Sequence, residues 1–135
     1  MRDQRDHDSE GERRKRDAHA RLRARRRLFV RRAQRALASV LLAVGRATID
    51  AVRAAVPLPP DIDPKLFGAV PGELARADVI RYDGFLRTTR AEAHARPVTV
   101  WALADRAAAL DWLTAHPDLP DDDTPHQRGL YDDLD

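Results

Sequence analysis

The chain has 135 residues, enough for one domain, and its 43% apolar content is sufficient for a small hydrophobic core. It contains no cysteine, which excludes a disulfide framework and a cysteine-ligated metal site. The longest apolar run, residues 36–44, is too short to cross a bilayer, so we expect a soluble, cytoplasmic protein rather than a membrane protein.

The net charge of +2 hides a strong charge asymmetry along the chain. Residues 1–35 contain fourteen Arg and Lys against six Asp and Glu, residues 36–116 contain nine of each kind, and residues 117–135 contain seven Asp against one Arg. This asymmetry is typical of a basic segment that binds a polyanion, a neutral folded body and an acidic tail. Because residues 1–17 and 117–135 have few apolar side chains, we predict a disordered charged arm and a disordered acidic tail there.

A basic amphipathic helix that leads into the core is predicted over residues 18–45. Its apolar residues recur on one face from Leu22 to Val44, and Gly45 is a typical helix stop. Arginines surround its first half, and residues 18–35 contain no acid. Because these arginines repel one another and cannot all face a core, we expect them to contact a polyanion. The candidates are Arg21, Arg23, Arg25, Arg26, Arg27, Arg31 and Arg32.

Two further helices are expected in the middle of the chain. Thr48 is a plausible N-cap of the first helix, which ends before Pro57. Asp63 and Pro64 are typical of the N-cap and first turn of the second helix. Pro71 removes a backbone hydrogen bond, so this helix should be kinked or divided into two short pieces.

The pattern then changes to that of β-strands. Residues 79–88 are rich in β-branched and aromatic residues, which predicts a strand. We interpret Gly84 as a bulge in this strand, while a tight hairpin turn at Asp83-Gly84 stays an alternative. A polar loop follows, and residues 97–103 form the next strand.

The order of these elements predicts the fold class. It is helix, helix, helix, strand, loop, strand and a last helix, which Asp105 caps and which ends near His116. This is a mainly α fold with a small β-hairpin (α+β) and has the connectivity of a winged helix-turn-helix, in which the third helix enters the major groove. We place the winged-helix domain at residues 46–116, between the long basic N-terminal helix and the acidic tail.

Three segments resemble small winged-helix DNA-binding proteins of bacteria and their phages. They are Asp63-Pro64-Lys65-Leu66-Phe67-Gly68-Ala69-Val70, Leu86-Arg87-Thr88-Thr89-Arg90 and Pro97-Val98-Thr99-Val100-Trp101. In phage proteins of similar appearance, a Ser/Thr-Thr-Arg segment opens the wing and a Val-x-Val-Trp strand closes it. The resemblance covers less than half of the chain, and it implies a fold and general DNA binding without a target or a pathway.

The wing and the third helix supply further candidates for DNA contact. Cations and hydroxyls on a wing lie along phosphates or reach into the minor groove. Small residues on the third helix permit close approach to DNA, but the lack of Asn and Gln there predicts modest sequence specificity. Aromatic residues, including Tyr82 and Phe85, fall within apolar patterns, so we assign them to the core rather than to base stacking. The candidates are Lys65 and Arg76 on the helix, and Arg87, Thr88, Thr89, Arg90, His94 and Arg96 on the wing.

These patterns together predict a non-enzymatic protein that binds double-stranded DNA, either a transcriptional regulator or a phage-like replication accessory factor associated with the nucleoid. The histidines lack metal-ligand spacing and no nucleophile–base pair occurs, so no metal, cofactor or small-molecule substrate is expected. Two alternatives stay open: a protein-interaction module that forms a homodimer or docks through the helix at residues 22–44, and an RNA-binding protein. The acidic tail is either an intramolecular DNA mimic or a solubilising segment.

Overall fold

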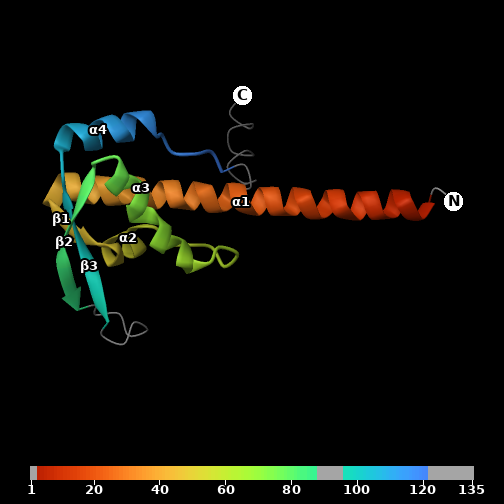
Figure 1. The fold of residues 1–135 in the computed structure, drawn as a ribbon, viewed down its shortest axis with the longest axis horizontal. Coiled ribbons are helices and arrows are strands. Elements are labelled where there is room, and N and C mark those ends of the chain that lie inside the picture. Colours follow the sequence, from red (N-terminus) through yellow and green to blue (C-terminus); the bar gives the residue numbers. More distant parts are fainter. Residues whose placement is uncertain (1–2, 88–95, 122–135) are drawn as a thin grey trace, which may run out of the picture.

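The computed structural model describes residues 3–87 and 96–121, which form an α+β fold (Figure 1). Four α-helices and a three-stranded antiparallel sheet are present in these residues, together with one 3-10 helix. In chain order they are α1 (Asp3–Val44), β1 (Arg46–Thr48), α2 (Ile49–Ala55), the 3-10 helix η1 (Pro64–Ala69), α3 (Val70–Arg76), β2 (Ile80–Arg87), β3 (Pro97–Leu103) and α4 (Arg106–Ala115).

The long helix α1 has a packed half and a projecting half (Figure 1). Every residue from 9 to 24 is exposed, whereas the second half contributes six buried residues to the core. The predicted stop at Gly45 is confirmed, since this glycine has a φ of 85°, a left-handed conformation that glycine adopts without steric cost. The buried residues of α1 are Leu28, Phe29, Ala33, Leu37, Ala38 and Leu41.

The predicted disorder of residues 1–17 is wrong for residues 3–17, which form the first turns of α1. A lack of apolar residues favours disorder but does not by itself prevent a helix. A helix that packing has already nucleated extends at little cost through residues of high helix propensity, and Arg, Gln and Glu are such residues. A Glu10–Arg14 pair at i,i+4, with 4.0 Å between its charged atoms, adds to this.

The short helices begin and divide as the sequence predicts. The three predicted N-caps are confirmed. Each side chain accepts a hydrogen bond from a backbone amide two or three residues further along, and the three residues are Thr48, Asp63 and Asp105. Pro71 divides the third helix: η1 precedes it, and α3 begins at Val70 with the proline in its first turn, where no amide hydrogen is needed.

The sheet has the strand order β1-β3-β2, so β3 is its central strand. The strand β1 was not predicted, because three residues between two helices carry no recognisable alternation. It exists through pairing with β3, in which Arg46 lies opposite Ala102 and Thr48 opposite Val100. The bulge predicted in β2 is confirmed by a register shift around Gly84, which has a φ of 94°.

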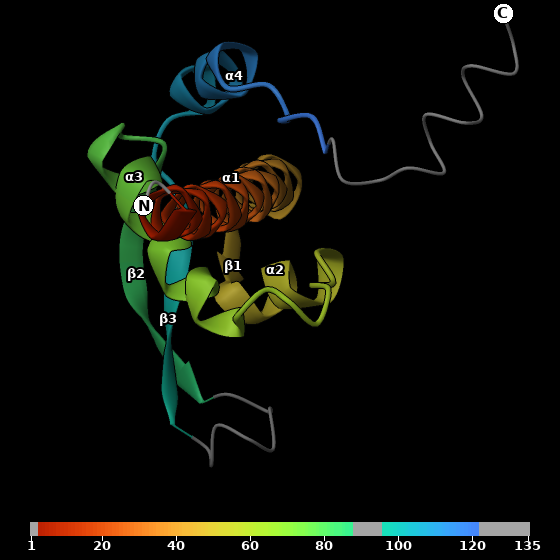
Figure 2. The ribbon, with the colours of Figure 1, turned by 90° about the vertical axis from the view of Figure 1, so that its right-hand side faces the viewer.

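A single core surrounds the packed half of α1 (Figure 2). The helix α4 lies on one side of α1, while α2, η1 and the sheet lie on the other side. The largest fully buried side chains come from α1, α2, η1, α3 and the residue before β2, and Trp112 of α4 is 5% exposed. The folded unit therefore includes residues 28–41 and is not confined to residues 46–116. The largest fully buried side chains are Leu37, Leu41, Val52, Leu66, Val70, Leu74 and Val79.

Candidate nucleic-acid interface

Residues 9–27 of α1, which we call the cationic arm, form a strongly charged surface. Eight of their cations are exposed, against three carboxylates, and no acid follows Asp17 within the arm. Successive residues of an α-helix are turned by about 100°, so the four consecutive cations at 13–16 alone surround the helix axis. The exposed cations are Arg13, Arg14, Lys15, Arg16, Arg21, Arg23, Arg26 and Arg27.

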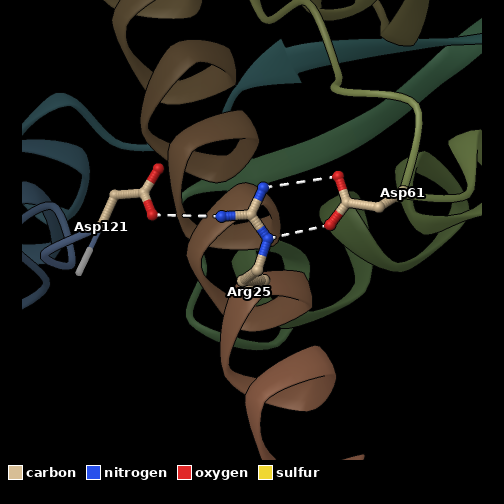
Figure 3. A network of polar contacts seen from close by, with 3 residues as sticks. All are labelled: Arg25, Asp61 and Asp121. Carbon is tan, nitrogen blue, oxygen red and sulfur yellow. Dashed lines mark hydrogen bonds and ion pairs between the residues drawn. The ribbon is translucent and has the colours of Figure 1, made fainter. Parts of the chain in front are cut away.

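Four of the seven predicted arginines, Arg21, Arg23, Arg26 and Arg27, therefore lie exposed on the cationic arm, as a phosphate-binding surface requires. Arg25 differs from them, because its side chain is only 20% exposed and is directed at two carboxylates (Figure 3). Its Nε donates a 2.9 Å hydrogen bond to Asp61, and its Nη1 donates a 3.2 Å hydrogen bond to Asp121.

The hydrogen bond that Arg25 donates to Asp61 holds the pKa of the Asp61 carboxyl below its ordinary value, and the positive charge of the arginine acts in the same direction. Arg25 thus joins three separate parts of the chain: the helix, the loop before η1 and the segment after α4. In the structure Arg25 therefore acts as a cross-link, and the DNA contact predicted for it stays a prediction.

Arg31 and Arg32 also have partners within the chain. Arg31 Nη1 donates a 2.8 Å hydrogen bond to the carbonyl oxygen of Pro117. Arg32 Nε lies 3.7 Å from a carboxylate oxygen of Asp118, and its guanidinium carbon lies 5.1 Å from the centre of the Phe29 ring. These two arginines thus contact the segment after α4, whose path the sequence could not show, and the DNA contacts predicted for them stay predictions.

This segment, residues 116–121, is here called the C-terminal strap. It is fixed to α1 through described contacts, so the predicted disorder of residues 117–135 is wrong for 117–121, while residues 122–135 lie outside the described residues. Arg35 Nη1, which was not among the predicted residues, donates hydrogen bonds of 2.8 Å and 2.7 Å to the carbonyls of Leu113 and His116. These bonds occupy carbonyls at the α4 C-terminus that lack helical partners.

The first strap residue also packs on α4. The His116 imidazole is stacked on the Trp112 indole, with 4.3 Å between ring centres and 13° between ring planes. Trp112 belongs to the buried core. The stack therefore connects the start of the strap directly to the interior of the protein.

On the third helix, both predicted cations are exposed. Lys65 lies in η1 and Arg76 at the end of α3, and the small residues between them that face solvent are Gly68, Ala69 and Gly72. The Glu73 carboxylate of α3 accepts a 2.8 Å hydrogen bond from the amide of Gln34, a buried polar residue of α1. Lys65 and Arg76 thus border a narrow surface of small residues, as predicted.

On the hairpin, the predicted residues Arg87 and Arg96 are exposed; Arg87 is the last residue of β2, and Arg96 directly precedes β3. The predicted wing residues Thr88, Thr89, Arg90 and His94 lie outside the described residues. The assignment of Tyr82 and Phe85 to the core is wrong, because they are 54% and 62% exposed and form an edge-to-face pair with ring centres 5.5 Å apart. Residue periodicity could not reveal that the distal half of β2 extends past the helices (Figure 1).

An ion-pair group fixes the hairpin to the other edge of the sheet. The carboxylate of Asp83, at the bulge of β2, forms ion pairs with two arginines: its oxygens lie 2.6 Å from Arg46 Nε of β1 and 3.6 Å from Arg81 Nη1. Both arginines pair with Ala102 of the central strand, so the three charged side chains lie over β3 on one face. This cover explains why Ala102 is only 2% exposed.

Within residues 3–87 and 96–121, no helix combines the length and the apolar character that crossing a membrane requires. Among the same residues, no three His, Asp or Glu side chains are grouped closely enough to hold a metal ion. No protein-family model matches this sequence, and no curated protein and no solved structure matches it either. Its function is therefore inferred from the residues and their geometry alone.

Proposed function

We propose that the protein binds double-stranded DNA as a winged-helix domain extended by the cationic arm. The observation that carries the proposal is the arm itself: eight exposed cations placed around a helix that projects from the body (Figure 1). A rigid rod of positive charge matches the closely spaced phosphates of a duplex, and each phosphate contact releases condensed counterions. Most of the affinity is then independent of sequence.

The order of the elements supports the winged-helix part of the proposal. A first helix, a short strand, two helices and a two-stranded hairpin follow one another, and β1 adds to the hairpin through β3. In this arrangement η1 and α3 enter the major groove, with Lys65 and Arg76 on phosphates at its borders. Arg87 and Arg96, at the distal end of the hairpin, contact the backbone beside the groove.

The exposed side of the third helix predicts weak base reading. Its residues between the two cations are small, and its carboxylate Glu73 is repelled by phosphate. This favours a protein that covers many DNA sites with similar affinity over one that selects a single operator.

The alternative of a homodimer through residues 22–44 has less support. The apolar face that suggested it is mostly buried in the chain's own core, and its exposed large side chains are Leu22 and Val44, at opposite ends. A coiled coil needs a continuous row of apolar residues between its helices. In the arm, the positions in line with the buried residues of α1 include Arg25 and Arg21, which are charged. RNA binding remains an outcome that the experiment below distinguishes.

The test is a binding titration of the full chain at a series of salt concentrations, with duplex DNA, single-stranded DNA and a structured RNA as ligands. Binding is measured by fluorescence anisotropy. The test variant is R23Q/R27Q, which removes two exposed charges at i,i+4. Because like charges at this spacing repel, the substitution does not weaken the helix. With two phosphate contacts fewer, log affinity falls less steeply with log salt, by about 1.8 per decade of salt. The affinity lost through the substitution is therefore about 60-fold greater at 0.1 M salt than at 1 M salt.

A control variant, R106Q/A107E, changes the net charge by the same amount at exposed positions of α4. Its slope is expected to stay close to that of the parent chain. Equal slopes for the two variants would contradict the proposal, because the arm would then act only through the overall charge. Stronger binding of the RNA than of the duplex at matched salt would replace DNA with RNA as the ligand.

A further inference from the structure

We propose that the hairpin stacks unpaired bases of single-stranded DNA on two exposed aromatic rings, those of Tyr82 and Phe85. The side of the hairpin that carries Tyr82, Phe85 and Arg87 is here called the stacking face. The stacking of bases on this face is independent of the proposed function. The resulting preference for a duplex that adjoins a single strand rests on it.

Strand register places the two rings on one face of the sheet. Tyr82 lies opposite Trp101 of β3, and Phe85 lies opposite Thr99, two residues away on the same strand. Side chains of alternate residues point to the same face of a strand, so Tyr82 and Phe85, three residues apart, would point to opposite faces of a regular strand. The bulge between them adds one residue and returns Phe85 to the face of Tyr82.

The stacking face is on the helix side of the sheet, and its rings extend past the helices. Trp101, opposite Tyr82, packs against the core, and this contact anchors the inner end of the face. The distal half of β2 lies beyond the helices, so both rings are more than half exposed (Figure 1). Their planes meet at 74° in an edge-to-face pair, in which one ring covers a single face of the other. Each ring therefore keeps a face open for a base.

The charge around the rings favours a nucleic acid over an apolar protein segment. Arg87 lies two residues beyond Phe85 on the same face and is exposed, so its guanidinium can reach the phosphate of a stacked nucleotide. Among the residues of β2 and β3, Asp83 carries the only carboxylate. It points to the opposite face, where it pairs with Arg46 and Arg81. A phosphate chain on the stacking face thus meets no carboxylate of these two strands.

The size of the aromatic surface fits bases better than a second copy of the chain. Tyr82 and Phe85 are 54% and 62% exposed, so together they offer roughly 250 Å². A stable interface between proteins needs about 800 Å² on each partner. In contrast, stacking of one base on an aromatic ring increases the affinity by about five- to 150-fold, so two rings are sufficient for a clear preference.

The first experiment detects stacking without a duplex. A thymine above an aromatic ring is shielded by the ring current, so the methyl proton NMR signals of a short oligothymidylate are expected to move upfield when the full chain is added. Y82L/F85L keeps apolar side chains but removes both rings, and it is expected to abolish the shift, whereas Y82F/F85Y keeps both rings and the shift. The control L86A truncates an exposed side chain on the opposite face of β2 and leaves the shift unchanged. Absence of an upfield shift with the parent chain would overturn the inference.

The second experiment separates bases from phosphates. Three ligands share one duplex: the first is blunt, the second has a single-stranded thymidine overhang, and the third has an overhang of equal length made of abasic sites. In anisotropy titrations the parent chain is expected to bind the thymidine overhang about ten-fold more tightly than the abasic one. Y82L/F85L is expected to bind the two overhangs equally, while Y82F/F85Y and L86A retain the preference. Equal binding of both overhangs by the parent chain would show that charge alone acts, and stacking would be overturned.

The outcomes distinguish this inference from the proposed function. If the parent chain binds the blunt duplex but gains nothing from the thymines, stacking is overturned and duplex binding stands. If the thymine signals move upfield but no duplex binds, the proposed function fails and stacking stands. Tighter binding of an oligouridylate than of an oligothymidylate of equal length would overturn the assignment to DNA. A dimer in sedimentation that Y82L/F85L converts to a monomer would show that the face joins two copies of the chain, which also overturns the inference.

Discussion

Removal of the Arg35 guanidinium is the perturbation for which the structure gives the clearest expected magnitude. One nitrogen of this side chain donates to the carbonyls of Leu113 and His116, at 2.8 Å and 2.7 Å, in a partly buried position. A hydrogen bond to a charged group contributes about 1.5–3 kcal/mol, and a cation at a helix C-terminus adds about 0.3–1 kcal/mol. The two bonds share one donor nitrogen, and water can reach the carbonyls in part, so R35Q is expected to lose about 2 kcal/mol of unfolding free energy.

Urea unfolding followed by circular dichroism measures this change. With a slope of about 1.5 kcal/mol per molar urea, a loss of about 2 kcal/mol lowers the midpoint by about 1.3 M. R31Q is the matched control, because Arg31 makes one exposed bond to the carbonyl of Pro117, and its loss is expected below about 1 kcal/mol. Equal midpoints for R35Q and R31Q would refute the argument that Arg35 fixes α4 to α1.

Three further substitutions test other parts of the structure. L37A removes a fully buried side chain of α1, and urea unfolding is expected to show a loss of about 3 kcal/mol or more. G84A places a Cβ where no atom lies within 4 Å, so its cost of about 1 kcal/mol comes from the left-handed backbone alone. R25Q removes the hydrogen bond that lowers the pKa of Asp61, and an NMR titration of this carboxyl is expected to show the pKa rising toward its ordinary value. Since the folded-state pKa lies below 3.8, the pair stabilises the fold above that pH and its contribution is lost as the pH falls through the folded value.

Local chemistry in the sequence was sufficient to predict most of the fold. The caps at Thr48, Asp63 and Asp105, the division at Pro71 and the bulge at Gly84 each depend on the conformational limits of a single residue type, which hold wherever the residue occurs. They could therefore be predicted without knowledge of distant partners.

Features that depend on distant segments could not be predicted in the same way. The strand β1 exists only because β3 lies beside it. Arg25 and Arg23 are two residues apart and chemically identical, yet one is cross-linked to Asp61 and Asp121 while the other is exposed. Their different roles are decided by where the strap and the loop before η1 pass, and nothing in the sequence around the two arginines encodes those paths.

The stack of His116 on Trp112 gives the molecule an optical reporter of its own. An imidazole held against an indole quenches the indole's emission, so the fluorescence of Trp112 depends on whether the chain following α4 is seated. The chain's other tryptophan, Trp101, lies in the central strand, so W101F gives a background in which Trp112 alone is recorded. Detachment of the C-terminal end can thus be timed in a stopped-flow instrument with no dye attached to the protein.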